Sequence, residues 1–91
     1  MDPQARLERA QRSFREAQMN LAAANNHYRV LQYRRAGVGE LLAAGRAIKT
    51  AREFYDRARG ELASAERMVE WYRTHATAPS YYRGRVWQRS T

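Results

Sequence analysis

The chain has 91 residues and no cysteine, and its 17 basic and 9 acidic side chains give a net charge of +8. This length makes one small domain, and the absence of cysteine excludes a disulfide framework, a thiolate nucleophile and a cysteine-based zinc site. All the basic residues except Lys49 are arginine, which fits either phosphate recognition or the codon usage of a GC-rich genome.

The first predicted helix covers about residues 2–36. Asp2 can cap its N-terminus, and Pro3 suits the first helical position, where a missing N–H costs nothing. From Leu7 onward, two series of small or apolar residues recur every seven positions, and the second follows the first by three. The large series is Leu7, Phe14, Leu21 and Tyr28, and the alanine series is Ala10, Ala17, Ala24 and then Leu31. This spacing puts both series on one stripe of an α-helix.

The segment RRAGVGE, residues 34–40, interrupts this repeat. Gly37 can adopt the left-handed conformation that ends a helix, and Glu40 in the first turn of the next helix complements the helix dipole. The repeat also slips here, because Arg35 to Leu41 is six residues instead of seven. We therefore predict a turn between two helices.

The second predicted helix covers about residues 40–75 and carries the same repeat. Its large series is Leu41, Ile48, Tyr55, Leu62 and Val69, and its alanine series is Ala44, Ala51, Ala58, Ala65 and then Tyr72. In an antiparallel pair, each layer matches one large residue with one alanine, which fills space evenly. The sequence thus predicts an all-α fold, an antiparallel two-helix hairpin built as an alanine-rich heptad coiled coil, in a domain spanning residues 1–76.

Residues 77–91 form a basic, aromatic C-terminal tail that we expect to be extended. Its sequence from Pro79, PSYYRGRVWQRST, contains three arginines, three aromatic residues and no acid. Pro79 marks a point where the second helix has already ended. Three alternatives are open for the tail: a strap that docks on the hairpin or a partner, a contact to phosphates or bases, and a disordered end. The aromatic residues favour the strap, because burying large rings is favourable.

Both helices carry further apolar residues outside the main stripe. In the first helix, Ala23 belongs to a set on the side away from the stripe, and in the second helix Ala47 belongs to a set that widens it. Two long helices share only one line of contact, so further surface must be covered. We predict assembly into a helical bundle or oligomer, with itself or another protein. The predicted partner-binding residues are Met19, Val30, Tyr33, Phe54, Met68, Trp71, Tyr81, Tyr82 and Trp87.

Residues 17–28, AQMNLAAANNHY, contain no charged side chain in a chain that is 29% charged. The cores of protein interfaces are depleted in charge while they keep groups that form hydrogen bonds. The stretch is therefore either part of such an interface or a local fluctuation of composition.

The alternative function is RNA or DNA binding by a basic hairpin tip and the tail. Folding into a hairpin gathers cations near the turn, where they can neutralise phosphates, and the tail aromatics can stack on bases. No recognised nucleic-acid module is present, however. Several charges also have the spacing of helix-face ion pairs, such as Glu8 with Arg12 and Glu53 with Arg57. The candidate nucleic-acid residues are Arg29, Arg34, Arg35, Arg46, Lys49, Arg52, Arg83, Arg85 and Arg89.

We predict no enzyme, no cofactor, no metal site and no small-molecule substrate. His27 and His75 lie far apart in the predicted hairpin, and neither stands at metal-ligand spacing beside the carboxylates of Glu66 and Glu70. The turn sequence AGVGE lacks the lysine and the spacing of a phosphate-binding loop. The sequence therefore offers no set of side chains that could converge on a substrate.

The preferred interpretation is a non-enzymatic interaction protein that acts as adaptor, scaffold element or small inhibitor through protein–protein contacts. No apolar run approaches the roughly 18–20 residues of a membrane span, and the first residues, MDPQARLERAQR, are polar where a signal peptide is apolar. We therefore expect a soluble, cytoplasmic protein without membrane contact.

Overall fold

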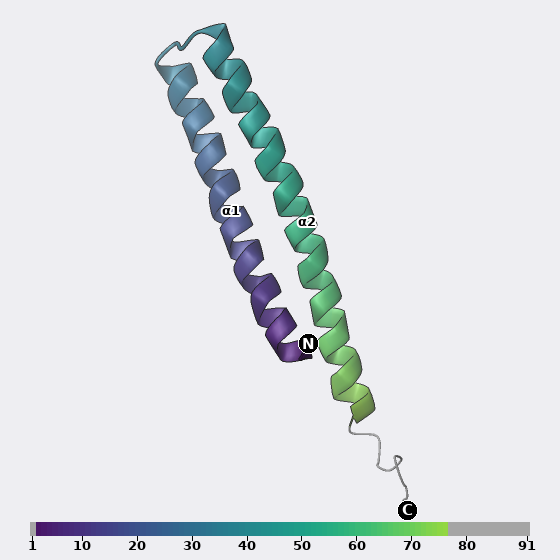
Figure 1. Ribbon diagram of the computed structural model, residues 1–91. Helices are drawn as coiled ribbons and strands as arrows, with labels where there is room; N and C mark the ends of the chain where they lie inside the picture. Colours follow the sequence, from purple (N-terminus) through teal and green to yellow (C-terminus); the bar gives the residue numbers. More distant parts are fainter. Residues whose placement is uncertain (1, 77–91) are drawn as a thin grey trace, which may run out of the picture.

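The computed structural model describes residues 2–76, which fold into two α-helices, α1 (Pro3–Tyr33) and α2 (Val38–Ala76). The helices lie side by side in opposite directions, and a short turn joins them at one end of the molecule (Figure 1). The described part contains no strand. The predicted all-α helical hairpin is confirmed, while every prediction made on the tail lies outside the described residues.

The start of α1 is capped as the sequence predicts. Asp2 has an extended backbone, and its side-chain Oδ2 accepts a hydrogen bond of 3.0 Å from the N–H of Ala5. Its backbone carbonyl accepts another of 3.0 Å from the N–H of Arg6. Pro3 is the first helical residue and has no N–H to satisfy. These contacts use two of the N–H groups that a helix start otherwise leaves unpaired.

The end of α1 differs from the prediction, which placed it at residue 36. The helix ends at Tyr33, and Arg35 is the residue that turns left-handed, with φ 58°, so the expectation for Gly37 is wrong. The N–H of Arg35 donates to the carbonyl of Gln32 at 3.0 Å, and the N–H of Ala36 donates to the carbonyl of Leu31 at 2.9 Å. This pair of bonds is a Schellman motif, which fixes the left-handed residue one position after the cap.

Replacing the left-handed arginine, Arg35→Gly, is expected to stabilise the hairpin by about 1 kcal/mol. A non-glycine residue in this conformation costs about 1–2 kcal/mol, and glycine offsets part of that gain through the entropy of the unfolded chain. Urea denaturation followed by circular dichroism, at one protein concentration, measures the change. The control Arg35→Ala removes the same charge and keeps the strain, so it should leave stability nearly unchanged. Equal effects of both variants would contradict the assignment of strain.

The turn leads into α2 two residues earlier than predicted, at Val38 instead of Glu40. The N–H of Leu41 donates to the carbonyl of Gly37 at 3.1 Å, so Gly37 stands at the N-terminal boundary of α2. Glu40 lies in the first turn, where an acid complements the dipole. With 39 residues, α2 is about 58 Å long at 1.5 Å per residue, and its last turns extend beyond the start of α1 (Figure 1).

Three contacts join the first half of α1 to the middle and the second half of α2. The rings of Phe14 and Tyr55 are 5.2 Å apart between centroids. One guanidinium nitrogen of Arg6 donates to Ser64 Oγ at 3.4 Å, and the other donates to Met68 Sδ at 3.2 Å. Since early residues of α1 meet late residues of α2, the pair is antiparallel.

The two helices bury small residues against each other and leave large ones partly exposed. Within residues 2–76, the buried apolar residues are Ala10, Ala17, Leu31, Ala44, Ala58 and Ala65, all from the alanine series of the two helices. The large series of both helices is half-buried throughout, and no large side chain of the described part is fully buried. Tyr72, the last member of the second alanine series, is 48% exposed and belongs to the last turns of α2.

Candidate interaction surfaces

The outer face of α1 carries three of the predicted partner-binding residues. Tyr33 is 91% exposed, Met19 is 71% exposed and Val30 is 42% exposed. Their helical spacing places them on one face with exposed Ala23, opposite the buried alanine series. Asn26, also exposed, stands among them, and its Oδ1 accepts a hydrogen bond of 3.5 Å from Arg29.

Phe54 lies on a second surface, where both helices contribute. Its side chain is 40% exposed and borders a shallow, mostly apolar hollow of about 510 Å³. Asn20 of α1 and Ala47 of α2 also line this hollow. The guanidinium of Arg57 stands 5.9 Å from the centroid of the Phe54 ring. The hollow thus combines a ring, small residues and a neutral amide between the helices.

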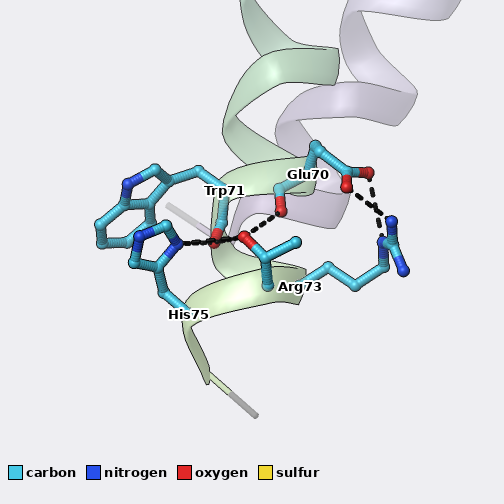
Figure 2. Close-up of polar contacts among 5 residues, drawn as sticks. Glu70, Trp71, Arg73 and His75 are labelled. Carbon is cyan, nitrogen blue, oxygen red and sulfur yellow. Dashed lines mark hydrogen bonds and ion pairs between the residues drawn. The ribbon is translucent and has the colours of Figure 1, made fainter. Parts of the chain in front are cut away.

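Aromatic side chains gather on the last turns of α2. The indole of Trp71 stacks on the imidazole of His75, with centroids 4.1 Å apart and planes 13° apart, and meets the ring of Tyr72 edge-on at 5.0 Å. Figure 2 shows the Trp71–His75 stack on the outside of the helix. Trp71 is 53% exposed, so this stack forms part of the surface. Sequence reasoning placed His75 on a flank but missed the stack, for which the four-residue spacing is the signal.

Polar groups close the same end of α2. The carbonyl oxygen of Trp71 accepts from His75 Nδ1 at 2.8 Å, and the Thr74 hydroxyl donates to the carbonyls of Glu70 and Trp71 at 3.1 Å each. Arg73 and Glu70 form an ion pair through two hydrogen bonds of 2.5 and 3.2 Å (Figure 2). The Thr74 hydroxyl and the His75 ring thus add side-chain hydrogen bonds to two carbonyls near the end of α2.

The predicted partner residues do not form one continuous patch on α2. Phe54 and Trp71 are about 26 Å apart along the helix at 1.5 Å per residue. Met68, 37% exposed, lies nearer to Trp71 and receives the hydrogen bond from Arg6. The predicted residues Tyr81, Tyr82 and Trp87 lie outside the described residues.

The predicted basic tip has exposed cations. In the described part, none of them lies within ion-pair distance of a carboxylate, and the ion pair seen in that part is at the other end of α2. The helix-face pairs expected for Arg12 and Arg57 are likewise not formed within residues 2–76. The tip cations are Arg29, Arg34, Arg35, Arg46, Lys49 and Arg52, whereas Arg83, Arg85 and Arg89 lie outside the described residues.

A row of neutral amides on α1 is the feature that sequence reasoning missed. Four of its five members directly follow a residue of the alanine series, and the fifth, Gln4, lies seven residues before the next. The row therefore repeats every seven residues along one flank of α1. Asn25 is half-buried and the other four are exposed. Within residues 2–76, none of these side-chain amides makes a hydrogen bond. The amide row consists of Gln4, Gln11, Gln18, Asn25 and Gln32.

The described residues lack two further kinds of feature, a metal-ion site and a membrane-crossing helix. No three histidine, aspartate or glutamate side chains there are grouped closely enough to hold a metal ion. Neither α1 nor α2 combines the length and the apolar character that a membrane-crossing helix requires.

The chain matches no family model, and the comparisons with curated proteins and with solved structures give no significant match.

Proposed function

We propose that the protein is a non-enzymatic helical-hairpin interaction protein that acts through protein–protein contacts as an adaptor, a scaffold element or a small inhibitor. In this proposal α1 and α2 pair as an alanine-rich antiparallel coiled coil, and another protein chain completes a helical bundle with them. The observation that carries the proposal is that every member of the large series, from Leu7 to Val69, is only half-buried in the described hairpin.

The half-buried large series provides the driving force for such contacts. Full burial of a large apolar side chain contributes about 1.5–3 kcal/mol. In the hairpin alone, each large-series residue from Leu7 to Val69 realises only part of that free energy, because its position is half-buried. A further helix packed along the hairpin removes the remaining apolar area from water. Binding of another chain is thus stabilised by surface that the hairpin already presents.

The exposed apolar residues support the same proposal. Large apolar side chains stand exposed on both helices, from Tyr33 and Val38 near the turn to Trp71 at the far end. Single exposed apolar residues need no explanation, but rimmed apolar surfaces mark sites of association. The hollow beside Phe54 has this character, since apolar lining meets the polar rim residues Glu53 and Arg57.

Photo-crosslinking tests this proposal in the cell that makes the protein. A photoreactive phenylalanine analogue in place of Phe54 is expected to form a covalent adduct with a polypeptide, either another copy or a different protein. The same analogue in place of Arg12, an exposed residue of α1, serves as the control and should form far less adduct. The proposal is wrong if Phe54 gives no adduct, or if nuclease removes the adduct that it gives.

RNA or DNA binding is the second candidate function, supported by the six tip cations. They are exposed and lack ion pairs within residues 2–76, so their charge is free to neutralise phosphates. Counterion release makes such binding strongest at low salt. A filter-binding titration at low salt with single-stranded RNA and duplex DNA tests it, and the absence of affinity for both would eliminate this candidate.

A further inference from the structure

The amide row differs from the matching flank of α2. On α2, the positions that directly follow the alanine series carry Gly45 and then mostly charged residues, Arg52, Arg59 and Glu66. Glutamine has about the same helix propensity as arginine, lysine and glutamate, and asparagine has a lower one. Helix formation therefore does not select amides over charges on α1. A row of five positions without charge, in a chain that is 29% charged, instead resembles the charge-depleted core of an interface.

The row also lies beside the surface that needs cover. Gln11, Gln18, Asn25 and Gln32 each follow a half-buried member of the large series by four residues. Residues four apart in a helix lie on the same face, one turn from each other. A helix that docks along the row therefore also covers the exposed parts of Leu7, Phe14, Leu21 and Tyr28.

The spacing of the row makes it complementary to itself. In a two-fold dimer, the same patch of both copies meets, so that if residue i contacts residue j, then j contacts i. Because the row is evenly spaced about Gln18, an antiparallel copy of α1 brings Gln18 opposite Gln18 and Gln11 opposite Asn25. Gln4 then lies opposite Gln32, so every amide meets an amide.

Amides suit this symmetric arrangement better than charges do. Each glutamine or asparagine side chain has both donors and an acceptor, so two identical groups can bond across a two-fold axis. Two identical charges at that position repel each other. Since the chain carries a net charge of +8, two copies repel each other at long range. Contact along a row of uncharged side chains adds no further repulsion between the facing groups.

We propose that the partner is a second copy of this chain, with the two α1 helices packed antiparallel along the amide row and the two-fold axis passing between the Gln18 side chains. The dimer is a four-helix bundle in which each copy covers the half-buried large series of the other. This inference rests on the proposed function and specifies its partner.

The first test places a charge at the proposed axis. Gln18→Glu brings two carboxylates face to face, and the dissociation constant of the dimer, measured by sedimentation equilibrium of the full chain, should rise at least tenfold. Arg67→Gln lowers the net charge by the same one unit at an exposed position of α2 outside the row and should leave the dissociation constant within a factor of about three. Circular dichroism of both variants checks that the helices persist. An unchanged dissociation constant for Gln18→Glu, with helices intact, would overturn the proposal.

The second test determines the register by charge complementation. Gln11→Glu alone and Asn25→Arg alone should each weaken the dimer, because each puts an unpaired charge against an amide. Both changes together in one chain should restore it, since the two new charges then meet twice across the axis. Within one chain these positions are about 21 Å apart at 1.5 Å per residue, so the rescue is intermolecular. A double variant as weak as the single ones would overturn the antiparallel register.

The outcomes separate this inference from the function on which it rests. A monomer at all concentrations whose Phe54 analogue crosslinks to a different protein overturns the self-pairing and supports the interaction function. Failure of the Phe54 analogue to crosslink to any protein, together with a monomer at all concentrations, overturns both. If the chain dimerises but Gln18→Glu does not weaken the dimer, the pairing along the amide row is wrong, while the interaction function stands.

Discussion

Leu31→Ala is expected to lower the free energy of unfolding of the hairpin by about 2–5 kcal/mol, the usual cost of truncating a buried leucine. Leu31 is 4% exposed and is the largest buried apolar side chain in the described residues. It also accepts, through its carbonyl, the hydrogen bond from Ala36 that closes α1. Truncation removes its packing next to the turn, where the two helices must stay together.

The matched control is Leu42→Ala on α2, near the same end of the molecule. Leu42 is 59% exposed, so its truncation should cost less than about 0.5 kcal/mol, as is typical of surface substitutions. Urea denaturation of both variants at the same protein concentration, followed at a helix-sensitive wavelength, gives the comparison. Equal losses at the two positions would mean that the depth of burial at Leu31 is not as described.

Ala17→Glu is expected to cost about 3–5 kcal/mol, the penalty of an uncompensated buried charge, and so to unfold most of the chain. Ala17 is fully inaccessible, with 0% of its surface exposed. The substitution also adds several atoms at a position where the helices approach on small residues, and such overpacking is itself destabilising. Thermal unfolding followed by circular dichroism measures the loss.

Ala23→Glu provides the comparison for the buried alanine. Ala23 is exposed on the outer face of α1, and the change there introduces the same charge into the same uncharged stretch. It should leave the melting temperature nearly unchanged. If Ala17→Glu melts like Ala23→Glu, the alanine series does not form the contact between the helices.

The seven-residue spacing of apolar residues was enough to predict two helices and a turn. Leu7, Phe14 and their successors can share a stripe only in a helix, and Asp2 with Pro3 indicated where the first one begins. The depth of burial was not predictable in the same way, because periodicity gives the side of a helix that faces its partner but not how closely the helices approach. The structure shows that they meet on the alanines, with the large residues half-buried.

The end of α1 was predicted less well. Gly37 was the obvious residue for a left-handed turn, yet the backbone hydrogen bonds from Arg35 and Ala36 close the helix two residues earlier. Such a motif depends on where the tertiary contact with α2 ends, which local sequence does not specify. Arg35 adopts the strained conformation because the turn must bring α2 back along α1.

The candidate surfaces were predictable in unequal measure. Exposed residues such as Met19 and Phe54 followed from their position off the main stripe. The amide row was overlooked because amides carry neither charge nor apolar surface, although its spacing of seven is visible in the sequence. The Trp71–His75 stack was also overlooked, although the four-residue spacing that permits it is visible in the sequence.

The measurement that tests the central claim most directly is the mass of the full chain in solution by sedimentation equilibrium, across a wide concentration range, after nuclease treatment and at both low and high salt. Association through amides and apolar side chains predicts a dimer, twice the chain mass of 10.6 kDa, that persists at high salt and dissociates only on dilution. A mass of 10.6 kDa at every concentration, or a larger species that high salt or nuclease abolishes, would contradict the account.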